Sequence, residues 1–202
     1  MIAPVALAAV RPFCDKVVAA DGGADGLSAF GVTPDLIVGD LDSLDDPTAW
    51  SARGVAVHHI AEQDSTDFEK AVARIDAPLI LGVGFTGKRL DHTLAVIAGL
   101  AKFGARGLIV VGEEDCAFAL PLQCRLDLPA GAVVSLVPLA EIAGLSSTNL
   151  RWPIDGLSFA PMGRGGTSNE ALGPVSMAFD RLGMVGLVAL ENLPAVVVAI
   201  EA

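Results

Sequence analysis

Short apolar runs alternate with helical segments through the first half of this 202-residue chain. Helical stretches separate five runs that we expect to be strands: residues 16–20, 35–38, 55–60, 78–83 and 107–111. Strands that are joined through helices pair in parallel, and the connecting helices then cover both faces of the sheet. The sequence therefore predicts an N-terminal three-layer α/β/α domain with a mainly parallel sheet.

The pattern changes after about residue 116. Helical periodicity is weak from there on, and proline and glycine separate five short β-like runs: residues 132–138, 145–152, 175–179, 184–190 and 195–200. Many short strands with such turn residues between them are typical of a sandwich. We therefore predict two domains, an α/β domain over residues 1–118 and an all-β sandwich over residues 119–202.

Aspartates follow the expected strands of the first half. Asp21 follows the first strand, and the later strands are followed by Asp40 and Asp42, by Asp67 and by Asp91. In an open α/β sheet, ligands bind outside the carboxyl ends of the strands. Each aspartate alone is also explained by a turn or a helix cap. Because all five fall at one edge of the sheet, a common site is the better interpretation.

Two of these acids lie only two residues apart, in the stretch Gly39-Asp-Leu-Asp-Ser43. Gly39 permits a close approach of another backbone at the end of the strand. Neighbouring carboxylates repel each other unless a proton or a cation lies between them. Oxygen ligands suit a hard cation such as Mg²⁺. Asp40 and Asp42 are therefore candidate metal ligands, and a simple Asp-rich turn is the alternative.

Glycines and cations near this edge suit phosphate. Gly22 and Gly23 follow the first expected strand, where backbone amides can approach phosphate oxygens. Lys88 and Arg89 supply positive charge beside Asp91, although a solvated surface pair is the simpler reading of those two cations. No Gly-Lys-Ser/Thr sequence is present, so this is not a P-loop of the Walker A type.

Composition excludes several classes of protein. Acidic residues outnumber Lys and Arg by 24 to 13, which leaves no basic surface for nucleic acid. No apolar run reaches the ~18 residues that a membrane span requires. The N-terminal segment lacks the basic start of a signal peptide. Three cysteines without metal or redox spacing fit a reducing compartment, so we expect a cytoplasmic protein.

Four motifs of the first half, in this order and spacing, resemble those of the thiamine pyrophosphokinase family: Ala20-Asp-Gly-Gly-Ala24, Pro34-Asp-Leu-Ile-Val-Gly-Asp-Leu-Asp-Ser43, Asp64-Ser-Thr-Asp-Phe-Glu69 and Gly87-Lys-Arg-Leu-Asp-His-Thr-Leu94. The second half is similar to the β-domain of the same family in Ser135–Pro138, Leu150–Pro153 and Gly166-Thr-Ser-Asn-Glu170. The resemblance covers nearly the whole chain from about residue 15.

The resemblance implies an enzyme that transfers the pyrophosphoryl group of ATP to thiamine and leaves AMP and thiamine diphosphate. It implies Mg²⁺ as cofactor, an α/β domain followed by a β-sandwich, and a homodimer. The thiamine site of the family lies between the α/β domain of one subunit and the β-domain of the other. Phosphoryl-type transfer mainly needs positioning and neutralised charge, which fits the acids found here.

The resemblance also implies roles for individual residues. Asp40, Asp42 and Asp21 would hold the metal. Catalysis would depend on Asp40, Asp42, Asp67 and Asp91, with either Asp67 or Asp91 as proton acceptor. The nucleotide and its phosphates would be bound by Asp21, Gly22, Gly23, Gln63, Thr66, Lys88 and Arg89. Ser168 and Asn169 would contact thiamine. Trp152 is either an aromatic partner of a substrate ring or a residue of the β-domain core.

One departure from the family concerns the N-terminus. Members usually have a further strand and a glycine-bearing loop before the helix that precedes Ala20-Asp-Gly-Gly, whereas this chain begins close to that helix. We expect such a difference to affect ATP binding more than the fold. Two alternative functions remain open: a thiamine or nucleotide sensor of the same fold, and a diphosphotransferase acting on another alcohol, such as a pterin.

Overall fold

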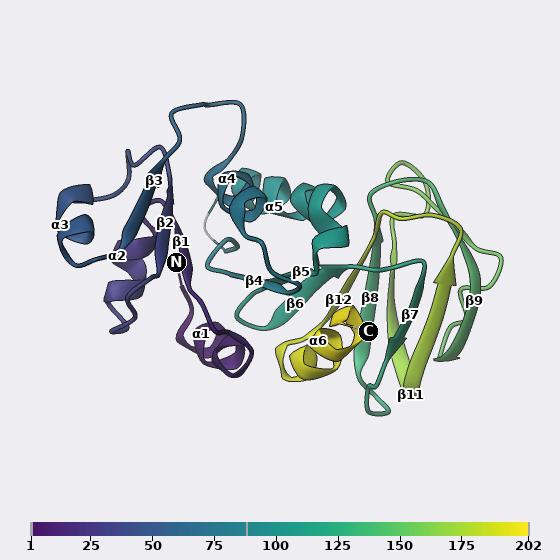
Figure 1. The fold of residues 1–202 in the computed structure, drawn as a ribbon. Helices are drawn as coiled ribbons and strands as arrows, with labels where there is room; N and C mark the ends of the chain where they lie inside the picture. The colour runs from purple at the N-terminus through teal and green to yellow at the C-terminus, as the bar shows by residue number, and fades with distance from the viewer. Residues whose placement is uncertain (1, 88, 202) are drawn as a thin grey trace. The chain divides into compact units, whose positions relative to one another are not determined.

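Figure 1 shows the computed structural model, which describes residues 2–87 and 89–201. By its contacts the chain divides into two compact units. Unit 1 comprises residues 1–77 and 83–96, and unit 2 comprises residues 78–82 and 97–202.

Unit 1 begins with α1 (Pro4–Val10) and a 3₁₀ turn at Arg11–Phe13. Its strands and helices then alternate as the sequence predicts: β1 (Val18–Ala20), α2 (Gly23–Ser28), β2 (Leu36–Gly39), α3 (Pro47–Ala52), β3 (Ala56–His59) and α4 (Asp67–Arg74). The three strands form a parallel sheet in the order β1-β2-β3. The predicted parallel arrangement is confirmed for this part of the chain.

Helices cover both faces of this small sheet. On one face, Ile37 of β2 and Ala19 of β1 pack with Leu27 of α2 and Trp50 of α3. On the other face, Val38 packs with Ala71 of α4. Adjacent residues of a strand point to opposite faces of the sheet. A strand whose residues are apolar on both faces therefore needs a helix to cover it on each side.

Unit 2 contains the longer sheet, and α5 (Leu90–Phe103) runs from unit 1 into unit 2. A 3₁₀ turn at Gly104–Arg106 follows α5. The strands of unit 2 are β4 (Ile80–Val83), β5 (Leu108–Val111), β6 (Asp115–Ala119), β7 (Gln123–Leu126), β8 (Val133–Pro138), β9 (Ile142–Leu150), β10 (Ser158–Phe159), β11 (Thr167–Phe179) and β12 (Met184–Ala189). A 3₁₀ turn at Leu190–Asn192 and α6 (Leu193–Glu201) end the described chain.

The long strand β11 organises unit 2. Thr167–Glu170 pair with β8, whereas Val175–Ala178 pair with β7, and β9 lies along its other edge. A break in register between Ala171 and Ser176 accompanies this change of partner. Among the described residues the sheet has the order β10-β9-β11-β8-β12-β6-β5-β4, with β7 on β11. Such irregularities let one strand serve two sheets.

The structure corrects two expectations. In the part of the chain that the structure describes, β4 and β5 belong to the large sheet and not to the parallel sheet of β1-β2-β3: β4 lies next to β5, and β5 pairs antiparallel with β6. The β-branched run at residues 195–200 is helical, so the second half is not all-β. Pro194 lies in the first turn of α6, and Leu193, Val196 and Val197 form its buried face at helical spacing.

The predicted domain boundary between residues 118 and 119 falls inside β6. Because β6 pairs with both β5 and β12, backbone hydrogen bonds cross that boundary. The assignment of different functions to residues 1–118 and 119–202 stays a prediction.

Candidate functional site

The ends of β1 and β2 meet closely because glycines stand where a side chain would collide. A Cβ atom at Gly39 would lie 2.8 Å from the Cβ of Asp21, and one at Gly22 would lie 2.4 Å from the carbonyl oxygen of Ser43. Asp21 itself has a φ of 46°, in the left-handed region that few residues other than glycine and Asx adopt. The close approach predicted for Gly39 is confirmed.

This geometry buries the Asp21 carboxyl group, which is only 3% exposed. Its Oδ2 accepts a hydrogen bond of 3.1 Å from the backbone N–H of Ser43. Its Oδ1 is buried and has no hydrogen-bond partner among the described residues. Burial raises the pKa of Asp21, and the hydrogen bond from Ser43 opposes that shift. A buried acceptor without a partner is costly, so a cation or a proton is favoured at this oxygen.

Asp40, directly after β2, has two side-chain donors on one oxygen. Its Oδ2 lies 2.9 Å from Nε2 of Gln63 and 3.0 Å from Nζ of Lys70. Lys70 comes from α4 and is 2% exposed. Hydrogen bonds, first from Lys70 and then from Gln63, lower the pKa of Asp40 to about 2. Asp40 is therefore a carboxylate at any physiological pH.

Helix α4 supplies the third acid. Thr66 accepts a hydrogen bond from the N–H of Glu69, and the Glu69 side chain accepts one from the N–H of Thr66, so the two residues form a capping box. This cap places Asp67 in the first helical turn. There its Oδ1 lies 3.2 Å from Nζ of Lys70.

Asp21, Asp40 and Asp67 converge, although they lie on three different segments. One carboxylate oxygen of each lies within 4.8 Å of the others. A set of oxygen donors that includes an oxygen without a partner fits a hard divalent cation such as Mg²⁺. We call Asp21, Asp40 and Asp67 the acidic triad.

Asp42 does not belong to this group among the residues that the structure describes. Its Oδ1 accepts a 2.9 Å hydrogen bond from the Ser43 hydroxyl group, and its N–H points to Asp40 at 3.4 Å. Its proposed role as a metal ligand stays a prediction.

Asp91 lies in the first turn of α5 and forms a bidentate ion pair with Arg89, with distances of 3.1 and 2.6 Å. Both side chains are exposed. The Arg89 hydrogen bonds lower the pKa of Asp91 to about 2. Over residues 2–87 and 89–201, the structure does not bring Asp91 to the acidic triad. Lys88 lies outside the described residues.

The two residues expected to contact thiamine belong to β11 in unit 2. Ser168 is exposed and stands opposite Ser135 of β8. Asn169 is buried, and its amide binds the backbone of Trp152 at 3.1 and 2.6 Å. The Trp152 side chain is exposed, so it is not a core residue.

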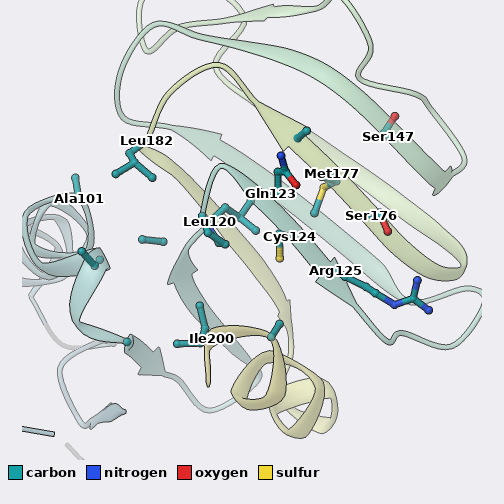
Figure 2. A pocket seen from close by; sticks show the side chains of 18 of the residues that line it. Ala101, Leu120, Gln123, Cys124, Arg125, Ser147, Ser176, Met177, Leu182 and Ile200 are labelled. Atoms are coloured by element: carbon teal, nitrogen blue, oxygen red, sulfur yellow. The ribbon is translucent and has the colours of Figure 1, made fainter. Parts of the chain in front are cut away.

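Unit 2 also contains a cavity of about 1030 Å³ (Figure 2), and Ser168, Asn169 and Trp152 do not line it. Residues of β7, β9 and β11 form one wall, among them Gln123, Thr148 and Ser176. Leu182 and the end of α6 at Ile200 also line it.

Lys70 is the functional candidate that sequence reasoning missed. Asp67 and Lys70 are three residues apart in α4 and therefore lie on one side of that helix. A lysine at this spacing, next to buried Ala71 and Val72, was the available signal. Helical spacing alone could not show that Asp40, thirty residues earlier, is its second partner.

Fold and site together define a class, the α/β proteins that gather ligand-binding side chains at the carboxyl ends of parallel strands. A family model described as thiamin pyrophosphokinase, catalytic domain, matches residues 10–111, half of the chain. The chain belongs to the thiamin pyrophosphokinase family, which is a family of enzymes. The resemblance inferred from the motifs is confirmed.

Solved structures show the same fold. Thiamin pyrophosphokinase from Geobacillus thermodenitrificans is 24% identical, with a TM-score of 0.73 and 90% of each chain covered. The Candida albicans enzyme is 18% identical, with a TM-score of 0.77, 94% of this chain covered and 87% of the other. The yeast enzyme is 16% identical, with a TM-score of 0.76, 96% of this chain covered and 84% of the other. Among curated proteins no match was found. None of the described helices could cross a membrane.

Proposed function

We propose that this protein transfers the pyrophosphoryl group of ATP to thiamine in a Mg²⁺-dependent reaction that yields thiamine diphosphate and AMP. The observation that carries the proposal is the convergence of Asp21, Asp40 and Asp67 on one point, in a chain of this family. The unpartnered oxygen of Asp21 supports a cation there.

The acidic triad would hold the metal, with Asp42 close by. Bound Mg²⁺ would supply neutralising charge to the phosphate oxygens of ATP. The protein's own part is to keep the carboxylates ionised and in place. Gln63 and Lys70 do so for Asp40, and the Thr66 cap holds Asp67 in the first turn of α4. Gly22, Gly23, Lys88 and Arg89 remain the proposed phosphate contacts.

Proton transfer from the thiamine hydroxyl group requires a carboxylate that can accept it. Asp91 is a weak base while Arg89 holds its pKa near 2. In this pairing Asp91 orients Arg89, and the acceptor is proposed to be Asp67 or, once released from Arg89, Asp91. Attack at the β-phosphorus then needs the hydroxyl group to be in line with the leaving AMP.

Thiamine would bind to Ser168 and to the exposed ring of Trp152, with Asn169 close to them. The thiazolium ring is cationic, and both an aromatic face and an acidic site attract it. We propose a homodimer in the cytoplasm whose thiamine site combines residues of two subunits, as the resemblance implies.

The assay is separation of nucleotides and thiamine esters by HPLC after incubation with ATP, thiamine and Mg²⁺. We expect AMP and thiamine diphosphate in equal amounts, and neither without Mg²⁺. ATP turnover without thiamine diphosphate would overturn the substrate assignment. AMP formation with a pterin alcohol but not with thiamine would support the other diphosphotransferase, and absence of turnover would support the sensor.

Replacing Asp40 by Asn should lower kcat at least a hundredfold, because it removes one negative charge from the metal site while keeping the shape of the side chain. Asp42→Asn tests the second predicted ligand in the same way. Asp46→Asn is the matched control, because Asp46 caps α3 and Asn caps a helix equally well. Near-normal kcat in Asp40→Asn would remove the metal role from that residue.

A further inference from the structure

The side chain of Asn169 is paired with the backbone of another residue, Trp152. Its Nδ2 donates to the carbonyl oxygen of Trp152 at 2.6 Å, and its Oδ1 accepts from the N–H of Trp152 at 3.1 Å. The same Oδ1 accepts from the N–H of Glu170 at 2.9 Å. Asn169 is 2% exposed, so both groups of the Trp152 backbone are satisfied where water has little access.

Trp152, in contrast to Asn169, is 54% exposed. It lies in a bend that follows the end of β9 at Leu150. A large aromatic side chain gains free energy when a ligand covers it, and a backbone that is already fixed lowers the entropy cost of that binding.

A second set of contacts holds the same bend. The backbone N–H of Arg151 donates to the carbonyl oxygen of Glu170 at 2.9 Å. The Arg151 side chain forms a 3.0 Å ion pair with Glu170, and its guanidinium carbon lies 5.3 Å from the centre of the Trp152 ring. Glu170 thus neutralises the cation that stands beside the ring. Residues 151–152 are tied to residues 169–170 through backbone and side chain together.

We propose that Asn169 is a positioning residue that acts on the substrate through Trp152. Its amide fixes the backbone of Trp152, so that the ring stands preorganised as a platform for the flat cationic ring of the substrate. This role rests on the proposed function. It differs from direct contact with thiamine, because the oxygen and one N–H of the amide are already used inside the protein.

The positioning role is tested without substrate by ¹⁹F NMR of the protein labelled with 5-fluorotryptophan. The chain has two tryptophans, Trp50 and Trp152, and Trp152→Phe assigns their signals. Asn169→Ser, which is too short to span both backbone groups, should shift and broaden the Trp152 signal and leave that of Trp50 unchanged. An unchanged Trp152 signal would overturn the proposal, whatever reaction the protein catalyses.

Asn149→Asp is the matched control. Asn149 also donates its amide to a backbone carbonyl group in unit 2, that of Pro174 at 2.7 Å, but it does not bind the Trp152 bend. Its replacement should leave the Trp152 signal in place. An equal shift in both variants would indicate general loosening of the β-strands and would contradict a specific role for Asn169.

A measurement on the unchanged protein guards against a variant that does not fold. The backbone N–H of Trp152 should exchange with deuterium much more slowly than an unstructured peptide, although its side chain is exposed. Exchange at the peptide rate would show that the amide pair does not persist in solution and would overturn the proposal.

Kinetics then connect the role to the substrate. Asn169→Ser should raise KM for thiamine about tenfold, corresponding to ~1.4 kcal/mol, with a smaller change in kcat. The double variant with Trp152→Ala should be no worse than Trp152→Ala alone, because Asn169 acts through that ring. If the losses of substrate binding in the two single variants add fully in the double variant, Asn169 contacts the substrate directly, which would contradict a role through Trp152. If thiamine is not the substrate, the NMR result stands by itself.

Discussion

Lys70 holds two carboxylates of the acidic triad with one buried ammonium group. Nζ lies 3.0 Å from Asp40 and 3.2 Å from Asp67, while the side chain itself is 2% exposed. A buried lysine is stable as a cation only when paired, and these acids repel one another without a positive charge. Lys70 is thus a neutralising charge that belongs to the protein itself.

Removing this charge should make folding depend on metal. In Lys70→Met without Mg²⁺, we expect the melting temperature to fall by about 5–10 °C, because a buried ion pair that loses one partner costs ~3 kcal/mol. Millimolar Mg²⁺ should raise the melting temperature more in the variant than in the unchanged protein, because the cation then neutralises the same carboxylates. Differential scanning calorimetry measures both.

Lys16→Met is the control, because Lys16 is an exposed lysine of the same unit. It should change neither the melting temperature nor the response to Mg²⁺. An equal Mg²⁺ response in the unchanged protein and in Lys70→Met would contradict the neutralising role of Lys70.

The low pKa of Asp40 predicts how this pair responds to acid. The folded-state pKa is about 2 and the ordinary value is 3.8, so the contribution of Asp40 to stability is fully present above pH ~5. It is lost as pH falls through 4 towards 2. The difference in free energy of unfolding between the unchanged protein and Lys70→Met should therefore shrink over that range. Urea denaturation at pH 6, 4 and 2.5 measures it, and a constant difference would contradict the assignment.

At the scale of elements, the cap of α4 links local sequence to the site. Thr66→Ala removes the hydrogen bond to the N–H of Glu69 and should cost about 1 kcal/mol in free energy of unfolding. Thr66→Ser keeps the hydroxyl group and should cost much less. Because Asp67 lies in the capped turn, Thr66→Ala should also weaken Mg²⁺ binding, which calorimetric titration measures. Equal behaviour of the two variants would show that the cap is unimportant.

Elements also show where sequence patterns mislead. The run of valines in α6 has strand propensity, but its buried face follows helical spacing and packing decides the outcome. The parallel strands β1, β2 and β3 were predictable because apolar runs between helices leave few alternatives. The separation of β4 and β5 from these three strands was not predictable, because the local sequence pattern of a strand does not show which distant strand it pairs with.

At the scale of the whole molecule, the proposed site shared between subunits has a direct test. Asp40→Asn should be inactive, and so should Ser168→Phe, whose bulky ring would stand where thiamine is proposed to bind. If one site takes its acids from one subunit and Ser168 from the other, a mixed dimer regains one intact site. Random mixing should then restore about a quarter of the normal activity.

A mixture of Asp40→Asn with Asp67→Asn is the matched control, because both substitutions fall in the same acidic triad. That mixture should stay inactive in any dimer with shared sites of this kind. Failure of Asp40→Asn and Ser168→Phe to complement, with dimers demonstrated by light scattering, would contradict the shared site.

Local spacing and short motifs were enough to predict the alternation of strands and helices in the first half and the family. They also indicated that acids gather at strand ends. Which of these acids meet depends on tertiary packing: Asp21, Asp40 and Asp67 converge, while Asp42 binds Ser43 and Asp91 binds Arg89. The inward lysine at position 70 and the pairing of Asn169 with Trp152 likewise depend on segments distant in sequence. Such contacts follow from how elements pack, and no local pattern encodes them.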